Sequence, residues 1–145
     1  MDENKEILTY IYQDIDMSIG SLKTLNKKIS NKDNKIKKVI DFLIKEYEER
    51  LKKVKKYIKK YKFDVKTNSF MSKMGATMGI NMEVMKDNSD SRIADMLIQG
   101  FTLGILNVSK RIDKYDKEVE KDIMELAKNF KKFQEDNVEL LKKYL

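Results

Sequence analysis

Five methionines recur at helical spacing near the middle of the chain, and they are the first residues whose chemistry needs an explanation. They follow one another in steps of three or four residues: Met71, Met74, Met78, Met82 and Met85. Thioethers are soft ligands that suit Cu(I), but the chain has no Cys or His to complete such a site. We therefore expect the methionines to pack against the protein's own core, or to bind a protein partner or a second copy of the chain.

A second group of residues is cationic. Residues 50–62 hold eight Lys or Arg and no acid, a pattern that suits an anionic membrane or a nucleic-acid backbone. The residues of this predicted surface are Arg50, Lys52, Lys53, Lys55, Lys56, Lys59 and Lys60. A solvated face is the alternative, because the apolar residues between them are also needed to pack the helix. Lys outnumbers Arg 28 to 3, whereas dedicated phosphate recognition tends to use the Arg fork.

Carboxylates and amides form the third group. Asp14, Glu46, Glu49 and Asn137 come from three expected helices. A polar stripe on a further helix adds Asp95, Gln99, Thr102, Ser109 and Asp113. Such oxygen ligands could hold a hard cation such as Mg²⁺, Mn²⁺ or Ca²⁺. The alternative is that the stripe faces water and that Asn137 sets the register of the helices.

The absence of histidine and cysteine excludes most catalytic chemistry. A di-iron carboxylate site needs Glu-x-x-His motifs, and neither a Ser-His nor a Cys-His nucleophile pair can form. We therefore expect no enzymatic activity, no metal and no cofactor, and nothing in the sequence indicates a small-molecule substrate. The run 87–91 resembles a calcium loop only superficially, since Arg92 and Ile98 stand where such a loop needs Gly and Glu. We expect that run to cap a helix.

The elements that must position these groups are expected to be helices. The chain of 145 residues has no proline, and it is 41% hydrophobic and 38% charged, which is typical of helical bundles. Its apolar residues recur every three or four positions. The expected helices span residues 3–29, 34–62, 70–86, 92–114 and 117–144. Asp33 is expected to cap the second of them.

The connections decide the topology. The turn at residues 30–33 is so short that the first two helices must form an antiparallel hairpin. Helix 70–86 and its flanks could cover about 26 Å at 1.5 Å per residue, enough to return the chain to its starting end. Helices 34–62 and 92–114 would then be parallel, joined by a helical crossover, and we favour this arrangement. The alternative is an up-down bundle with helix 70–86 lying across one end.

Two glycine pairs have the Gly-x-x-x-Gly spacing, Gly75 with Gly79 and Gly100 with Gly104. Small residues four apart let two helices approach closely. A glycine in a helix interior costs roughly 1 kcal/mol relative to alanine. We therefore expect all four to lie in a close contact between helix 70–86 and helix 92–114, which offsets that cost.

Part of the chain resembles a known group of proteins. The run DNSDSRIADMLIQG at 87–100, the pair Gly104-Ile105 and residues 137–145 are similar to small uncharacterised helical proteins of anaerobic low-GC bacteria, which are described as ferritin-like. The resemblance covers the C-terminal half well and the first hairpin only by pattern. It implies a ferritin-like four-helix bundle and no particular activity.

These observations predict a single all-α domain over residues 1–145, a ferritin-like four-helix bundle with a crossover helix. The start MDENKEILTY has no apolar leader segment, and the longest apolar stretch, 93–108, is too short and polar to span a bilayer. We therefore expect a soluble, cytoplasmic protein. Its expected role is metal-free binding or structure through the Met- and Gly-rich segment. The alternatives are a basic-surface binder of anionic membrane or nucleic acid through helix 34–62, and a ferritin-like carboxylate metal-binding protein.

Overall fold

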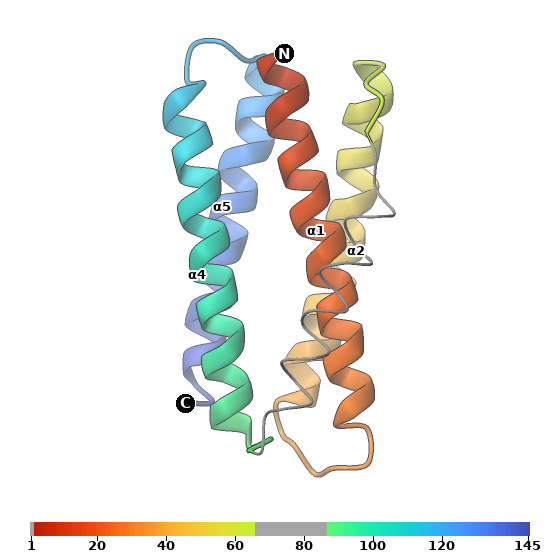
Figure 1. The fold of residues 1–145 in the computed structure, drawn as a ribbon, viewed down its shortest axis with the longest axis vertical. Helices are drawn as coiled ribbons and strands as arrows, with labels where there is room; N and C mark the ends of the chain where they lie inside the picture. The colour runs from red at the N-terminus through yellow and green to blue at the C-terminus, as the bar shows by residue number, and fades with distance from the viewer. Residues whose placement is uncertain (1, 66–86) are drawn as a thin grey trace.

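The computed structural model describes residues 2–65 and 87–145 and places four long helices side by side (Figure 1). They are α1 (Glu3–Lys28), α2 (Lys37–Lys60), α4 (Asp90–Lys114) and α5 (Lys121–Lys142). No strand occurs in these two ranges, so the predicted all-α character and the four long helices are confirmed for them. The predicted helix 70–86 lies outside the described residues, together with its five methionines and with Gly75 and Gly79.

Helices α2 and α4 run in the same direction. At one end of the bundle, the Asn34 side chain donates hydrogen bonds to the Asn88 carbonyl at 2.8 Å and to the Asp90 carboxylate at 2.9 Å, so both helices begin there. At the other end, Lys60 Nζ lies 2.8 Å from Asp122 Oδ2, so α2 ends where α5 begins (Figure 1). The chain therefore leaves α2 and enters α4 at opposite ends. This geometry is the parallel arrangement, and it rules out the up-down topology.

The core lies along the hairpin of α1 and α2 and the hairpin of α4 and α5, which meet mainly through α1. The α1 residues that recur in steps of three or four positions are buried throughout: Leu8, Ile11, Ile15, Ser18, Leu22 and Leu25. On α2, Tyr47 is fully buried and touches both helices of the other hairpin. Its ring centroid lies 6.0 Å from that of Phe101 on α4 and 4.9 Å from that of Phe133 on α5. One aromatic residue thus joins three helices. It does so through one stacked and one edge-to-face ring contact, the two geometries that aromatic pairs prefer.

The start of α2 differs from the prediction. The helix begins at Lys37 rather than 34, and no side chain of its own caps it, so the assignment of Asp33 as the cap was wrong. Asp90, from the first turn of α4, takes that role. Its carboxylate accepts hydrogen bonds from the backbone N–H groups of Lys35 at 3.1 Å and Ile36 at 3.3 Å. Free N–H groups at a helix start attract an anion from whichever segment lies nearest.

Helix α4 is capped as the sequence predicts, and α5 begins later than expected. Ser89 precedes α4, and its hydroxyl accepts a hydrogen bond from the Arg92 backbone N–H at 3.2 Å, so the run 87–91 is confirmed as a helix cap. Helix α5 starts at Lys121 rather than 117. The backbone N–H of Glu120 donates to the Asn4 side chain at 2.8 Å, which ties this turn to the start of α1.

Candidate binding surface on helix α2

The second half of α2 carries six exposed lysines. Val54 is buried and Leu51 and Ile58 are partly buried, so the apolar side of the helix is occupied by its packing. The lysines on the other side are all exposed: Lys52, Lys53, Lys55, Lys56, Lys59 and Lys60. A helix whose apolar side is already packed can bind a partner only through its charges.

The six exposed lysines are not equivalent. Lys52 Nζ lies 3.2 Å from Glu49, and Lys60 Nζ lies 2.8 Å from Asp122. The hydrogen bond to Asp122 raises the pKa of Lys60 and lowers that of Asp122. Within the described ranges, the other four make no ion pair: Lys53, Lys55, Lys56 and Lys59. These four, here called the lysine face, are the charges that are available to an anionic partner.

Arg50 stands apart from the lysines with which the sequence grouped it. It is partly buried, and its guanidinium carbon lies 3.9 Å from the centroid of the Phe133 ring on α5, a cation–π contact. Burial lowers the pKa of Arg50, while the nearby Glu46 carboxylate acts in the opposite direction. Arg50 Nε is buried and has no hydrogen-bond partner in the part of the chain that the structure describes. Arg50 therefore faces α5 rather than solvent.

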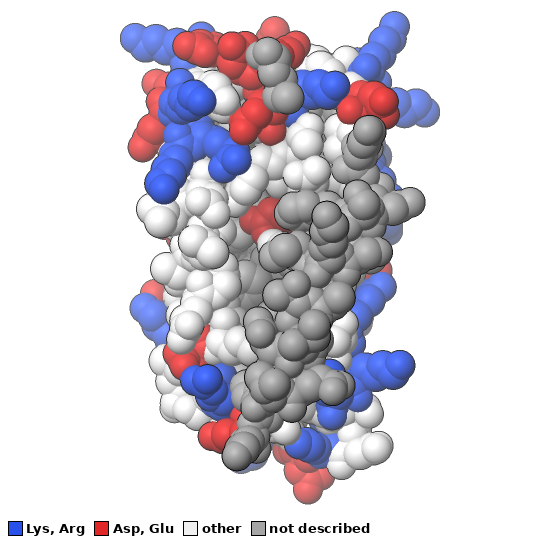
Figure 2. All heavy atoms as spheres, in the orientation of Figure 1, with Lys and Arg blue, Asp and Glu red and all other residues white. Residues whose placement is uncertain are grey.

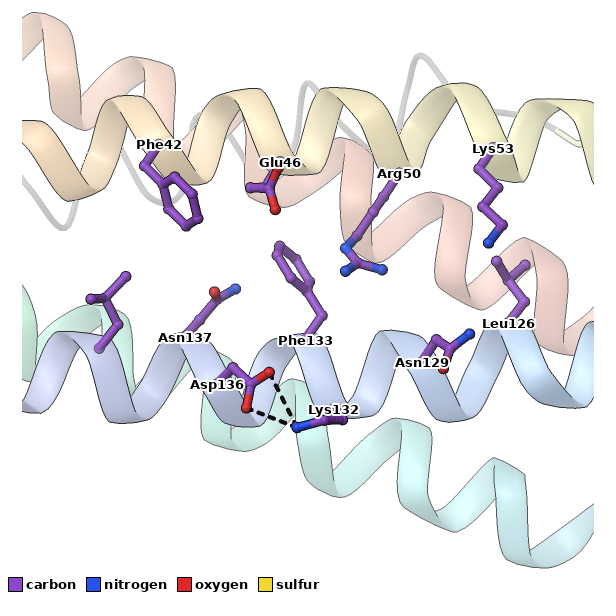
Figure 3. Close-up of a pocket in the computed structure, with 11 residues that line it drawn as sticks. Phe42, Glu46, Arg50, Lys53, Leu126, Asn129, Lys132, Phe133, Asp136 and Asn137 are labelled. Atoms are coloured by element: carbon purple, nitrogen blue, oxygen red, sulfur yellow. Dashed lines mark hydrogen bonds and ion pairs between the residues drawn. The ribbon is translucent and has the colours of Figure 1, made fainter.

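A groove between α2 and α5 surrounds this contact. It has a volume of about 580 Å³, and Figure 3 shows Arg50 and Phe133 pointing toward each other across it. The groove is lined by Phe42, Glu46, Arg50, Lys53, Leu126, Asn129, Lys132, Phe133, Asp136, Asn137 and Leu140. Lys132 pairs with Asp136 at 3.3 Å within α5. The lining thus combines four apolar or aromatic side chains with two amides and five charged side chains.

A separate polar cluster lies inside the bundle around Asp14, whose side chain is 8% exposed. Its carboxylate accepts hydrogen bonds from Gln134 Nε2 at 3.1 Å and from Ser18 Oγ at 3.4 Å. Burial raises the pKa of Asp14 to about 6, and these hydrogen bonds counteract part of that rise. Burial also raises the pKa of Tyr10, whose hydroxyl donates to the Gly104 carbonyl at 3.4 Å. Asp14 and Gln134 are buried, and Tyr10 is partly buried.

The two glycines of α4 have different surroundings. A Cβ at Gly104 would lie 2.6 Å from Gln134 Nε2 and 3.3 Å from Asp14 Oδ2, so Gly104 makes room for the Asp14 cluster. At Gly100, no described atom lies within 4 Å of such a Cβ. The predicted contact of this pair with Gly75 and Gly79 lies outside the described residues.

The carboxylates considered for a metal site lie apart from one another. Asp14 is in the interior, Glu49 pairs with Lys52, and Asp95 pairs at 3.2 Å with Arg92 on the surface of α4. Over residues 2–65 and 87–145, no three His, Cys, Asp or Glu side chains come close enough to hold a metal ion. These ranges therefore give the carboxylate-metal alternative no support.

Sequence reasoning missed Gln134, which is 1% exposed and binds Asp14 from α5. The spacing of the sequence contained a signal for it. Gln134 lies four residues after the core residue Phe130 and three residues before Asn137, so all three lie on one side of the helix. Two neighbouring amides on a buried helical stripe indicate a polar partner on a facing helix. The groove was also missed, because it depends on how far α2 and α5 stand apart.

Comparison with known proteins adds no identification. No protein-family model, no curated protein and no solved structure matches this chain significantly. None of the four described helices has the length and apolar character that a membrane-spanning segment requires.

Proposed function

We propose that this protein is a non-enzymatic binding protein that adsorbs to anionic membrane surfaces through the lysine face of α2. The observation that carries the proposal is that Lys53, Lys55, Lys56 and Lys59 are exposed and form no ion pair in the described part of the chain. A rigid helix that gathers unpaired positive charge on one side creates a positive potential that attracts negatively charged surfaces.

A membrane surface suits this face better than nucleic acid does. Lysine is a point charge that needs no fixed geometry, and each lysine near an anionic membrane contributes about 1 kcal/mol. Specific phosphate and base recognition relies more on arginine forks, and Arg50, the arginine of this region, points toward Phe133. Since Val54 is buried in the bundle, adsorption must be electrostatic rather than by insertion. Binding should therefore weaken strongly with salt.

The test is co-sedimentation of the full chain with vesicles of phosphatidylcholine alone and with added phosphatidylserine, at low and near-physiological salt. We expect binding only to the vesicles that contain phosphatidylserine, and a loss of at least tenfold when the four lysines become Gln. The matched control removes equal charge from exposed lysines on other surfaces: Lys27, Lys110, Lys117 and Lys143. An equal loss in the control, or tighter binding to duplex DNA than to the vesicles, would overturn the proposal.

A second candidate function is self-association, which the sequence assigns to the Met- and Gly-rich segment. The observation that favours it lies on α4, where Leu103 is 59% exposed and Leu106 is 51% exposed. Figure 2 shows that the middle of the surface over α4 carries few charges, whereas both ends of the bundle are densely charged. Light scattering should give twice the 17.2 kDa mass of the chain, and Leu103→Asn with Leu106→Asn should return the monomer. A monomer in the unmodified protein would refute this candidate.

We also propose that the bundle is ferritin-like, with a helical crossover joining α2 to α4. The parallel direction of α2 and α4 supports this proposal, because one crossover connection in a four-helix bundle produces that arrangement. The resemblance carried by residues 87–100 and 137–145 points the same way.

A further inference from the structure

Two N–H donors in the α2–α5 groove have no acceptor among the described residues. Asn137, on α5, is 3% exposed, and its Nδ2 has no hydrogen-bond partner within residues 2–65 and 87–145. Arg50 Nε, from α2, is likewise buried and unpaired. Both residues line the same groove, and Figure 3 shows them on either side of the Phe133 side chain. Buried N–H groups almost always have an acceptor in a folded protein. The lack of one for these two donors therefore needs an explanation.

Packing alone does not account for these donors. Asn137 occupies a seam position of α5, where Phe130, Phe133 and Leu141 are apolar and buried, and the buried Gln134 is bonded to Asp14. An apolar residue there would fill the seam without leaving an unpaired donor, which is costly in a buried position. The retention of an amide that points toward a groove is explained if the groove receives a molecule with acceptor oxygens.

The walls of the groove define the rest of such a molecule. Phe42 lies toward one end and Leu126 toward the other, with the Phe133 ring between them (Figure 3), and Leu140 also lines the groove. Apolar and aromatic walls of this kind bury the body of a small ligand, and the volume of about 580 Å³ suits one. The space thus fits an apolar body that carries a polar head group.

The charges facing the groove determine the sign of that head group. Lys132 and Asp136 pair with each other at 3.3 Å and cancel. The remaining charged side chains of the lining are Arg50, Lys53 and Glu46, which leaves a net positive charge. Arg50 is also the charged group whose Nε is unpaired. A carboxylate matches both the donors and the charge, and an arginine can bind a carboxylate through two parallel hydrogen bonds.

We propose that the groove between α2 and α5 binds an amphiphilic carboxylate, an apolar chain or ring that ends in a carboxylate. Arg50 and Asn137 donate hydrogen bonds to the carboxylate oxygens, and the apolar body packs on Phe133 and along Phe42, Leu126 and Leu140. The site shares Lys53 with the lysine face, but its other lining residues lie between α2 and α5 and are separate from that face.

The experiment is a titration of the full chain with decanoate and, in parallel, with decanol, followed by calorimetry and by amide chemical shifts. We expect decanoate to bind at least tenfold more tightly than decanol, with the largest shifts around Asn137 and Arg50. Arg50→Gln and Asn137→Leu should each weaken decanoate binding at least tenfold. Glu46→Gln should strengthen it, because it removes the carboxylate that opposes the ligand's charge.

Two controls separate a binding site from a purely structural role. Asn137→Leu should keep or raise the thermal stability of the free protein, since it removes an unpaired buried donor, while it weakens binding. Lys59→Gln, on the lysine face, should leave decanoate binding unchanged. Equal affinity for decanol and decanoate, or unchanged binding by both the Arg50→Gln and Asn137→Leu variants, would overturn the proposal.

Discussion

Asp14 is buried beside Gln134 and Ser18 in the centre of the bundle. Burial raises its pKa from the ordinary 3.8 to about 6, because the charged carboxylate loses its hydration. Between these two pH values, the folded chain holds a proton on Asp14 that the unfolded chain has released. The contribution of Asp14 to the free energy of unfolding is therefore fully present below about pH 4, and roughly 3 kcal/mol of it is lost as the pH rises to about 6.

Asp14→Asn tests this pH dependence, because the amide does not titrate but can still accept from Gln134. Urea unfolding of both proteins between pH 4 and 7 measures the difference in unfolding free energy. We expect the unfolding free energy of the variant to increase relative to that of the unmodified protein as the pH rises toward 6. Above pH 6 the difference between the two should be constant. A difference that does not vary with pH would show that burial leaves the titration of Asp14 unchanged.

Gly104 and Gly100 offer a matched pair of substitutions on one helix. Gly104→Ala places a Cβ 2.6 Å from Gln134 Nε2, so the amide must move and lose its buried hydrogen bond to Asp14. We expect a net loss of about 1 to 2 kcal/mol of stability, measured by urea unfolding, because this loss exceeds the gain in helix propensity. Gly100→Ala, with no described atom within 4 Å of the Cβ, should gain up to about 1 kcal/mol. Equal effects at both positions would contradict this assignment.

At the scale of the helices, the start of α2 depends on a residue of α4. Asp90 accepts from the Lys35 and Ile36 backbone N–H groups. We expect Asp90→Ala to cost about 1 to 2 kcal/mol of stability, as the loss of a helix cap usually does. Asp33→Ala is the control, since Asp33 is exposed and does not cap the helix. Thermal unfolding of the two variants measures this difference. A larger loss of stability in Asp33→Ala than in Asp90→Ala would contradict the assignment.

The sequence predicted which helix faces are buried better than it predicted how the helices end. The seams of α1 and α5 follow from the spacing of apolar residues alone, because a helix with one apolar side has one way to bury it. The cap of α2 could not be found in this way, since Asp90 lies 55 residues from Lys35 in the chain. Position along the sequence carries no information about such a partner.

The candidate site shows the same limit. Arg50 was grouped with the lysines because it is charged and lies in the same run of the sequence. What distinguishes it from them is its contact with the ring of Phe133, which lies on another helix. Asn137 was recognised as a polar residue in the seam of α5, but its missing acceptor becomes visible only when its neighbours are known. The lysine face, in contrast, was predicted from local pattern, because exposure on a packed helix follows from its periodicity.

At the scale of the whole molecule, the sequence left two topologies open because the length of the connection allows both. Three hydrogen bonds between distant segments decide between them: Asn34 with Asn88, Asn34 with Asp90, and Lys60 with Asp122. They place the starts of α2 and α4 at one end of the bundle. The direction of a helix is thus decided by polar contacts at its ends, while its burial is decided by its apolar seam.

The parallel direction of α2 and α4 predicts which positions a short cross-linker can join. The chain has no cysteine, so a pair of introduced cysteines reacts cleanly. We expect Asn34→Cys with Asn88→Cys to be joined by a short bis-maleimide, because Asn34 Nδ2 lies 2.8 Å from the Asn88 carbonyl. Lys62→Cys with Asn88→Cys should not be joined, although these positions are closer in sequence, because the 24 residues of α2 separate the two ends by about 36 Å. Mass spectrometry of the monomer distinguishes the two outcomes, and efficient cross-linking of the second pair would favour the up-down bundle instead.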